Sequence, residues 1–168
     1  METWIAAALT GAGATLVLDL WALARTKLFG VPSPDYRLVG RWFAWLPRGR
    51  IRHDPITASA PLPGERAIGW TAHYLIGIVF ALALPAIAGF GWFAHPTIGP
   101  PLAVGIASLA APFLVMQPAM GYGIAASRTP KPAAARLRSL TTHAVFGLGL
   151  YGAGWATAGL NALFNRAS

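Results

Sequence analysis

Four polar side chains stand out because they occur inside otherwise apolar segments: Asp19, His73, Gln117 and His143. Histidine changes its charge near neutral pH, and an ionised carboxylate in hydrocarbon costs several kcal/mol unless it is paired, protonated or hydrated. Ionisable side chains inside a membrane are therefore candidates for binding a proton or a ligand. We predict that these four residues form one polar site of this kind.

The depth of the four residues along predicted helices supports a shared layer. Asp19, His73 and His143 each lie between five and seven residues from an arginine at the end of their segment. At about 1.5 Å per residue, that spacing places them about 8 to 11 Å from the arginine. Gln117 lies slightly deeper, about 16 Å from its flanking arginine by the same helical rise. Each predicted helix thus contributes one polar side chain to the same layer.

The two histidines leave three roles open. His73 and His143 could form a structural hydrogen bond between helices, titrate as part of a binding site, or serve as axial ligands of a haem, with Gly77 and Gly147 leaving space for it. The chain has no cysteine, and its histidines and carboxylates show no spacing typical of a metal centre. A serine nucleophile motif and a phosphate-binding loop are also missing from the sequence. We therefore assign no catalytic residue, expect no enzyme, and expect no cofactor, with haem as the alternative.

The segments that carry these residues are typical of membrane helices. Hydrophobic residues make up 55% of the 168 residues and charged residues 11%, and no Lys, Arg, Asp or Glu occurs from Ala67 to Ser127. We predict an all-α membrane protein, a single domain of four transmembrane helices packed in a bundle. Continuously apolar segments fit a β-barrel poorly, and the first segment resembles no cleaved signal peptide. The predicted spans are residues 3–25, 67–90, 99–126 and 139–164.

The basic residues predict the orientation of these spans. Twelve of the thirteen lie in or beside the first and third connections, and only Arg166 lies elsewhere. Because cytoplasmic loops of membrane proteins carry an excess of Lys and Arg, both connections are expected in the cytoplasm. We therefore expect a multi-pass protein of the bacterial inner membrane with both termini in the periplasm. The same distribution explains the net charge of +8 without a nucleic-acid partner.

The cytoplasmic connection, residues 26–66, contains one amphipathic stretch. Ser33-Pro34-Asp35 is typical of a helix start, and large apolar residues then recur at helical spacing up to Leu46. We predict a short helix in the headgroup layer of the membrane, where arginines attract anionic lipids and indoles bury at the interface. An irregular loop packed on the bundle is the alternative. The residues that would make these contacts are Arg37, Arg41, Trp42 and Trp45.

An internal similarity links the second and fourth spans. The pattern R-x4-T-x-H-x3-G begins at Arg66 and again at Arg136, seventy residues later. The other two spans show little comparable similarity, so a duplication and a coincidence both remain open. A duplication would give two tandem helical hairpins with His73 and His143 in equivalent positions.

Several motifs together resemble a bacterial family of small integral membrane proteins known only as domain of unknown function 2938. The resemblance covers nearly the whole chain and implies an inner-membrane protein with several spans. It implies no activity, cofactor or catalytic residue. The motifs are Asp19-Leu20-Trp21, Val39-Gly40-Arg41-Trp42, Leu46-Pro47-Arg48-Gly49-Arg50, Arg52-His53-Asp54, Pro63-Gly64-Glu65-Arg66, Gln117-Pro118-Ala119-Met120-Gly121 and Ser127-Arg128-Thr129-Pro130.

These observations favour proton-linked transport or sensing of a small molecule, with Arg66 and Arg138 at the mouth of the polar site. Four helices are few for a solute pathway, so we expect a homo-oligomer or a larger membrane complex. Two other classes remain open: a non-catalytic accessory subunit of a membrane complex, and a haem-binding electron-transfer subunit. The lipid bilayer is the one partner that the sequence directly predicts.

Overall fold

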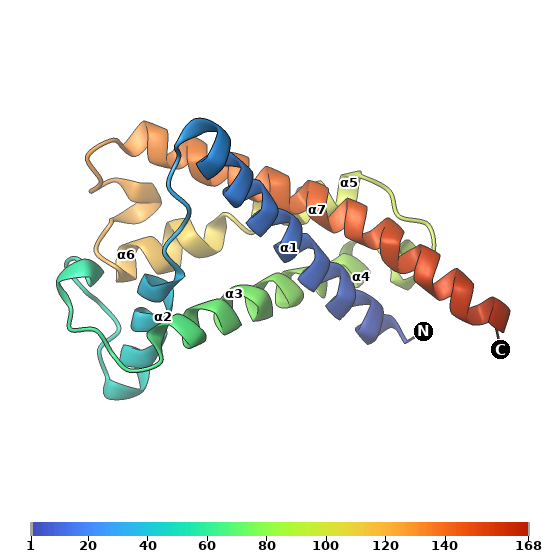
Figure 1. The fold of residues 1–168 in the computed structure, drawn as a ribbon, viewed down its shortest axis with the longest axis horizontal. Helices are drawn as coiled ribbons and strands as arrows, with labels where there is room; N and C mark the ends of the chain where they lie inside the picture. Colours follow the sequence, from blue (N-terminus) through green and yellow to red (C-terminus); the bar gives the residue numbers. More distant parts are fainter. Residues whose placement is uncertain (1, 168) are drawn as a thin grey trace. The chain divides into compact units, whose positions relative to one another are not determined.

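A computed structural model describes residues 2–167, and the side chains of residues 165–167 are not part of that description. The described residues form helices joined by turns and loops, and they contain no β-strand (Figure 1). The chain divides into two compact units, which are described separately. Unit 1 comprises residues 1–33, 74–107 and 142–168, and unit 2 comprises residues 34–73 and 108–141.

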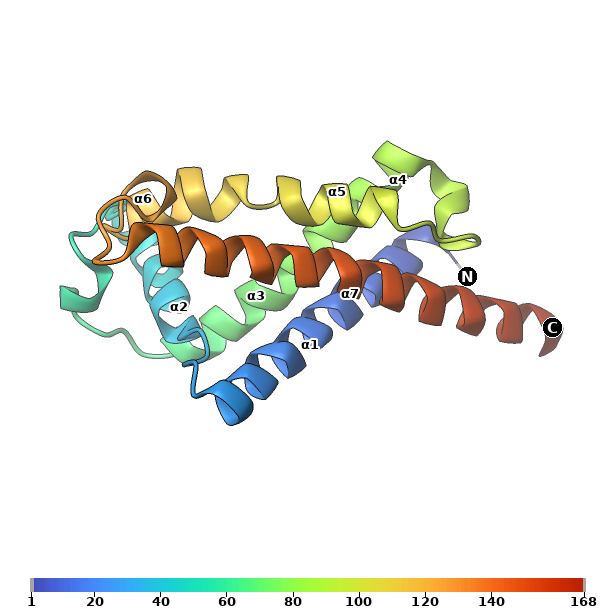
Figure 2. The same ribbon diagram turned by 90° about the horizontal axis from the view of Figure 1, so that it is seen from above.

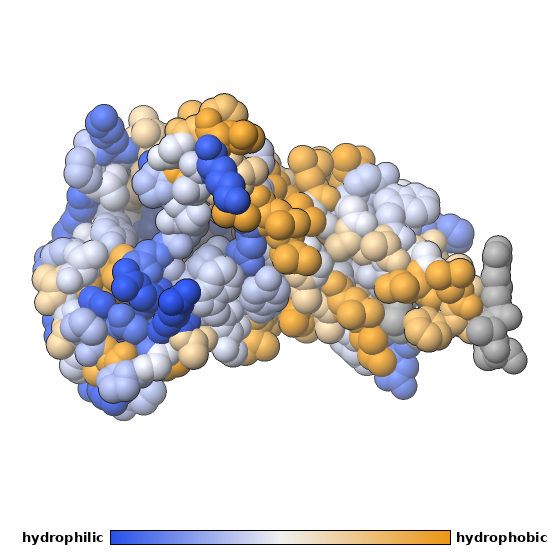
Figure 3. Space-filling model, in the orientation of Figure 1, coloured by the Kyte–Doolittle hydropathy of each residue, from blue (hydrophilic) through white to orange (hydrophobic). Residues whose placement is uncertain are grey.

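Three helical stretches are long and apolar enough to cross a membrane. They are Thr3–Phe29, Glu65–Ala88 and Gly99–Ala119. Many of their large apolar side chains are exposed, including Leu20 at 57% and Val79 at 62%, and Figure 3 shows apolar side chains over much of the face that it draws. In water such exposure would be unfavourable, whereas in lipid it is expected. The prediction of helices long and apolar enough to span a membrane is therefore confirmed for these three stretches.

The fourth predicted span lies in α7 (Pro132–Ala167), which is not among these three. Its apolar part contains glycines, threonines and His143, which lower the mean hydropathy. The four-span count therefore stays a prediction. The third stretch also ends at Ala119 rather than near residue 126, because Pro118 and the positive-φ residues Gly121 and Gly123 turn the chain there.

Unit 1 contains α1 (Thr3–Phe29), α4 (Ala83–Ala88) and α5 (Gly99–Ala107), together with the later part of α3 (Glu65–Ala81) and most of α7. Small residues dominate the inner face of α1, which lets neighbouring helices approach closely. Thr10 Oγ1 donates a hydrogen bond to Thr157 Oγ1 at 3.3 Å and so links α1 to α7. The core residues of the unit are Ala6, Ala7, Ala14, Ala81, Leu84, Trp92, Phe93, Val104, Phe146 and Leu150.

Unit 2 contains α2 (Tyr36–Trp45), the start of α3, the π-helix Ala111–Met116, α6 (Gln117–Ala119) and the start of α7. The predicted helix start is confirmed, because the Asp35 carboxylate accepts a hydrogen bond from the Arg37 backbone N–H at 3.1 Å. Figure 2 shows α2 beside the beginning of α3. The two helices cross at Gly40, where an added Cβ would lie 1.8 Å from the Glu65 carbonyl oxygen.

Candidate functional site

Asp19 lies on α1 in unit 1 and is partly buried. Its Oδ2 accepts a hydrogen bond from the Tyr74 hydroxyl on α3 at 3.0 Å. The bond joins two of the helical stretches that can cross a membrane, and both of its side chains are ionisable. The sequence-based prediction did not include Tyr74. Its position within an apolar segment, next to His73, could have indicated that it belongs to the site.

His143 also belongs to unit 1, on α7, and is partly buried. It forms a hydrogen bond with the backbone of Gly105 on α5. This contact matches the structural role that the sequence left open for the histidines, a hydrogen bond between neighbouring helices. Within unit 1, the contacts described for Asp19 and His143 therefore reach different helices.

His73 lies on α3 in unit 2, inside a small aromatic cluster. Its ring stacks on Tyr36 of α2, with ring centroids 4.0 Å apart and planes at 25°, and it meets the edge of Trp70 at 5.9 Å. Stacking of this kind fixes the orientation of the imidazole. The cluster thus joins α2 to the beginning of α3.

Gln117 begins α6 in unit 2, directly after the π-helix Ala111–Met116. π-helical turns occur often at functional sites, and prolines remove backbone donors in the first turn of this one, at Pro112, and just after it, at Pro118. Among the described residues, the buried Oε1 of Gln117 has no hydrogen-bond partner. A buried carbonyl oxygen without a donor is unfavourable, so it is a candidate acceptor for a ligand or water. Because two of the four predicted site residues lie in each unit, the common site remains a prediction.

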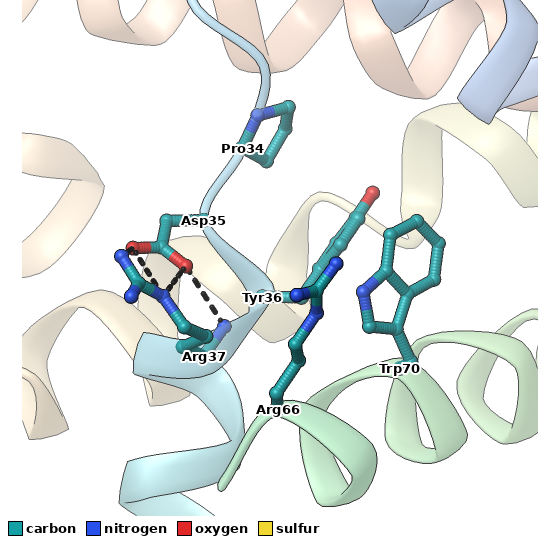
Figure 4. A pocket seen from close by; sticks show the side chains of 6 residues that line it. All are labelled: Pro34, Asp35, Tyr36, Arg37, Arg66 and Trp70. Carbon is teal, nitrogen blue, oxygen red and sulfur yellow. Dashed lines mark hydrogen bonds and ion pairs between the residues drawn. The ribbon is translucent and has the colours of Figure 1, made fainter. Parts of the chain in front are cut away.

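Arg66, predicted at the mouth of the site, lines a cavity in unit 2 with a volume of about 330 Å³. Figure 4 shows its guanidinium rising from α3 towards Tyr36 and Trp70, with Asp35 and Arg37 on the other side. Arg138, the other predicted mouth residue, is exposed on α7 and does not line this cavity.

The four residues assigned to the amphipathic helix have different surroundings within unit 2. Arg37 is exposed and Trp45 partly exposed, but Trp42 is buried and donates from Nε1 to the Ile51 carbonyl at 2.9 Å. Arg41 forms a salt bridge with Glu65, with Nε to Oε2 at 2.8 Å and Nη2 to Oε1 at 3.0 Å. The helix therefore supports unit 2 from within and also presents Arg37 outside.

His53 lies in the loop between α2 and α3 and is buried in unit 2 at 3% exposure. Its Nδ1 lies 2.6 Å from Ser59 Oγ, and its backbone N–H donates to the Ala119 carbonyl. Burial and the nearby charge of Arg50 hold the pKa of His53 below its usual value, so the neutral imidazole is favoured. The motif residues around position 53 thus anchor the loop to α6.

The space that the haem hypothesis needed is occupied in unit 1. An added Cβ at Gly77 would lie 2.0 Å from Thr15 Oγ1, and one at Gly147 would lie 2.9 Å from the Pro101 carbonyl oxygen. Both glycines therefore lie close against neighbouring helices. Among the residues that the structure describes, no group of three or more His, Cys, Asp or Glu side chains is arranged to hold a metal ion.

Comparison with known proteins gives one match. No curated protein and no solved structure matches the chain. A family model described as "Protein of unknown function (DUF2938)" matches residues 8–157, which include the Asp19–Tyr74 pair, the Arg66 cavity and the His53 network. The chain therefore belongs to this family.

Proposed function

We propose that the protein is a four-span inner-membrane protein that binds a proton at Asp19 and couples this step to the transport or sensing of a small molecule. The Asp19–Tyr74 hydrogen bond is the observation that carries the proposal. Ionisable residues in membrane-spanning helices are costly and tend to mark proton or substrate pathways. The orientation with both termini in the periplasm follows from the distribution of basic residues.

The geometry of the pair supports a proton-dependent change in helix packing. The Tyr74 hydroxyl donates to Asp19 Oδ2, and such a bond is weaker to a protonated carboxyl than to a charged carboxylate. Because Asp19 and Tyr74 belong to α1 and α3, a weaker bond would loosen the contact between the two helices. His73, Gln117 and His143 remain in the proposal as the other polar residues of the predicted layer.

Infrared difference spectroscopy of the full chain in lipid nanodiscs tests the proposal. On acidification, the wild type should show the carbonyl band of a protonated carboxyl in an apolar environment. Asp19→Asn should abolish this band, and Tyr74→Phe should shift it, since the hydroxyl partner is lost.

The matched control is Asp54→Asn. Asp54 is 79% exposed and lies 4.0 Å from Arg128, so its carboxyl should give no band from an apolar environment. A spectrum of Asp19→Asn identical to that of the wild type would refute the proposal. Reporter fusions test the orientation separately: fusions at residue 52 should report cytoplasm, and fusions at either terminus should report periplasm.

The remaining parts of the proposal concern assembly. A homo-oligomer is expected if solute crosses the membrane, because four helices offer little space for a pathway. The accessory-subunit hypothesis predicts a different result, namely stoichiometric companions after purification in mild detergent. Mass spectrometry of the purified complex separates the two.

A further inference from the structure

The cavity lined by Arg66 has an unbalanced positive charge. It is formed by Pro34, Asp35, Tyr36, Arg37, Arg66 and Trp70, all within unit 2 (Figure 4). Two arginines and one aspartate therefore belong to its lining. The partner of the Asp35 carboxylate determines which class of ligand the cavity can bind.

The Asp35 carboxylate is fully engaged by Arg37. Arg37 Nε donates to Oδ1 at 3.0 Å and Nη2 donates to Oδ2 at 2.8 Å, while the Arg37 backbone N–H also donates to Oδ1. These hydrogen bonds hold the pKa of Asp35 below its usual value, so the carboxylate stays charged and the pair persists at neutral pH. The charges of Asp35 and Arg37 thus cancel each other.

The second carboxylate near Arg66 is also occupied. Glu65, its neighbour in sequence, is held by Arg41 on both oxygens and accepts a further hydrogen bond from the Leu62 backbone N–H at 3.2 Å. Within the described part of the chain, Arg66 itself has neither an ion pair nor a hydrogen bond. Its guanidinium is therefore the uncompensated charge of the cavity.

The position of Arg66 indicates where its ligand comes from. It is the second residue of the stretch Glu65–Ala88, which is able to cross a membrane, so it lies where a span meets the headgroups. Two apolar side chains follow on the same helix, Ile68 at 37% exposure and Trp70 at 40%. A phosphate group at Arg66 would thus have lipid chains beside it, and guanidinium matches phosphate geometry.

We propose that this cavity binds the phosphate of an anionic phospholipid headgroup through Arg66, with Tyr36 and Trp70 as its aromatic walls. The proposal goes beyond the proton site, because it uses none of the contacts of Asp19. It would hold even if Asp19 had no functional role. Free inorganic phosphate shares the same chemistry and is separated from lipid by the experiment.

Native mass spectrometry of the full chain in zwitterionic detergent tests this proposal. Short-chain phosphatidylglycerol and phosphatidylcholine are added in equal amounts, and the ratio of bound lipids is measured. The wild type should prefer phosphatidylglycerol, and Arg66→Gln should lower this preference about fivefold, as expected for one basic residue at a membrane surface. Arg52→Gln is the matched control, since it removes the same charge from an exposed loop residue outside the cavity.

A second variant changes binding in the opposite direction. Asp35→Asn keeps a side chain that can cap α2 but releases Arg37 from its ion pair, which raises the charge of the cavity. Preference for phosphatidylglycerol should then rise about fivefold. A variant that merely misfolds would lose binding, so opposite effects of Arg66→Gln and Asp35→Asn distinguish charge from folding.

Three results would overturn the proposal. The first is an unchanged lipid preference in Arg66→Gln, and the second is an equal loss in Arg52→Gln. The third is displacement of the bound lipid by inorganic phosphate at the same concentration, which would identify a soluble phosphate ligand instead. If Arg66→Gln does not fold, Arg66→Lys replaces it and should show a smaller loss, because lysine keeps the charge without the planar fork.

Discussion

Replacement of Glu65 by glutamine should open the contact between α2 and α3. Glu65 and Arg41 form a two-point salt bridge whose side chains are only 13% and 11% exposed. In Glu65→Gln, the guanidinium of Arg41 stays in this partly enclosed position but loses its counter-charge. The guanidinium keeps its hydrogen bond from Arg41 Nη1 to the Ser59 carbonyl, at 3.0 Å.

The size of the effect follows from burial. Removing one partner of a buried ion pair costs about 3–5 kcal/mol, mostly because the remaining charge is left uncompensated. Glutamine retains one carbonyl oxygen and the Ser59 contact is unchanged, so the lower end, about 3 kcal/mol, is expected. This free energy corresponds to roughly a hundredfold increase in local opening.

Unit 2 also contains an exposed ion pair that serves as an internal control. The side chains of Arg37 and Asp35 are 61% and 40% exposed, so their attraction is screened by solvent. Asp35→Asn removes the charge and keeps a residue that can cap the helix, and it should cost less than about 1 kcal/mol. The two variants remove one negative charge each and differ mainly in burial.

Hydrogen–deuterium exchange of the full chain in detergent micelles measures the difference. Amides of α2 should exchange roughly a hundred times faster in Glu65→Gln and less than about five times faster in Asp35→Asn, because local opening follows the free energy of that region. Equal exchange rates of the two variants would refute the argument that burial determines the strength of this pair.

Two further predictions concern unit 2. Since the folded state disfavours protonation of His53, while the unfolded chain binds a proton at its ordinary pKa of 6.5, stability should fall as the pH decreases below that value towards the lowered pKa. Hydrogen–deuterium exchange of residues 49–64, measured at several pH values, tests this prediction. The pH dependence of their stability should disappear in His53→Gln. Gly40→Ala should force α2 away from α3, because the new Cβ would lie 1.8 Å from the Glu65 carbonyl oxygen. A loss of roughly 1–3 kcal/mol is expected from such overpacking. The check is faster exchange of α2 than in Gly91→Ala, where nothing lies within 4 Å of the new Cβ.

Much of the fold could be predicted because its signals are local. The apolar segments, the start of α2 at Asp35 and the purely helical character of residues 2–167 follow from composition and from short-range capping. The exact helix ends were less predictable. The third stretch stops at Ala119 because prolines and positive-φ glycines combine there, and no single residue gives that signal.

The candidate site was less accessible from sequence. The polarity of Asp19 was evident, but its partner Tyr74 lies 55 residues away, and pairing at that distance depends on how α1 and α3 pack. In the haem alternative, Gly77 and Gly147 leave space beside them, but in the structure Thr15 and Pro101 lie against these glycines. A glycine in the sequence shows only that a side chain is missing. Which atoms fill the space beside it depends on how the neighbouring helix packs.

The sequence alone determined that the chain is helical, that it contains apolar segments long enough to cross a membrane, and that a few polar residues lie within those segments. These properties depend on hydrophobicity and local backbone preference, which each segment carries by itself. The tertiary structure decided which carboxylate each arginine binds: Asp35 holds Arg37, Glu65 holds Arg41, and Arg66 is left to face the cavity. Charge pairing acts over a few ångströms in space, so it becomes defined only when the helices have packed.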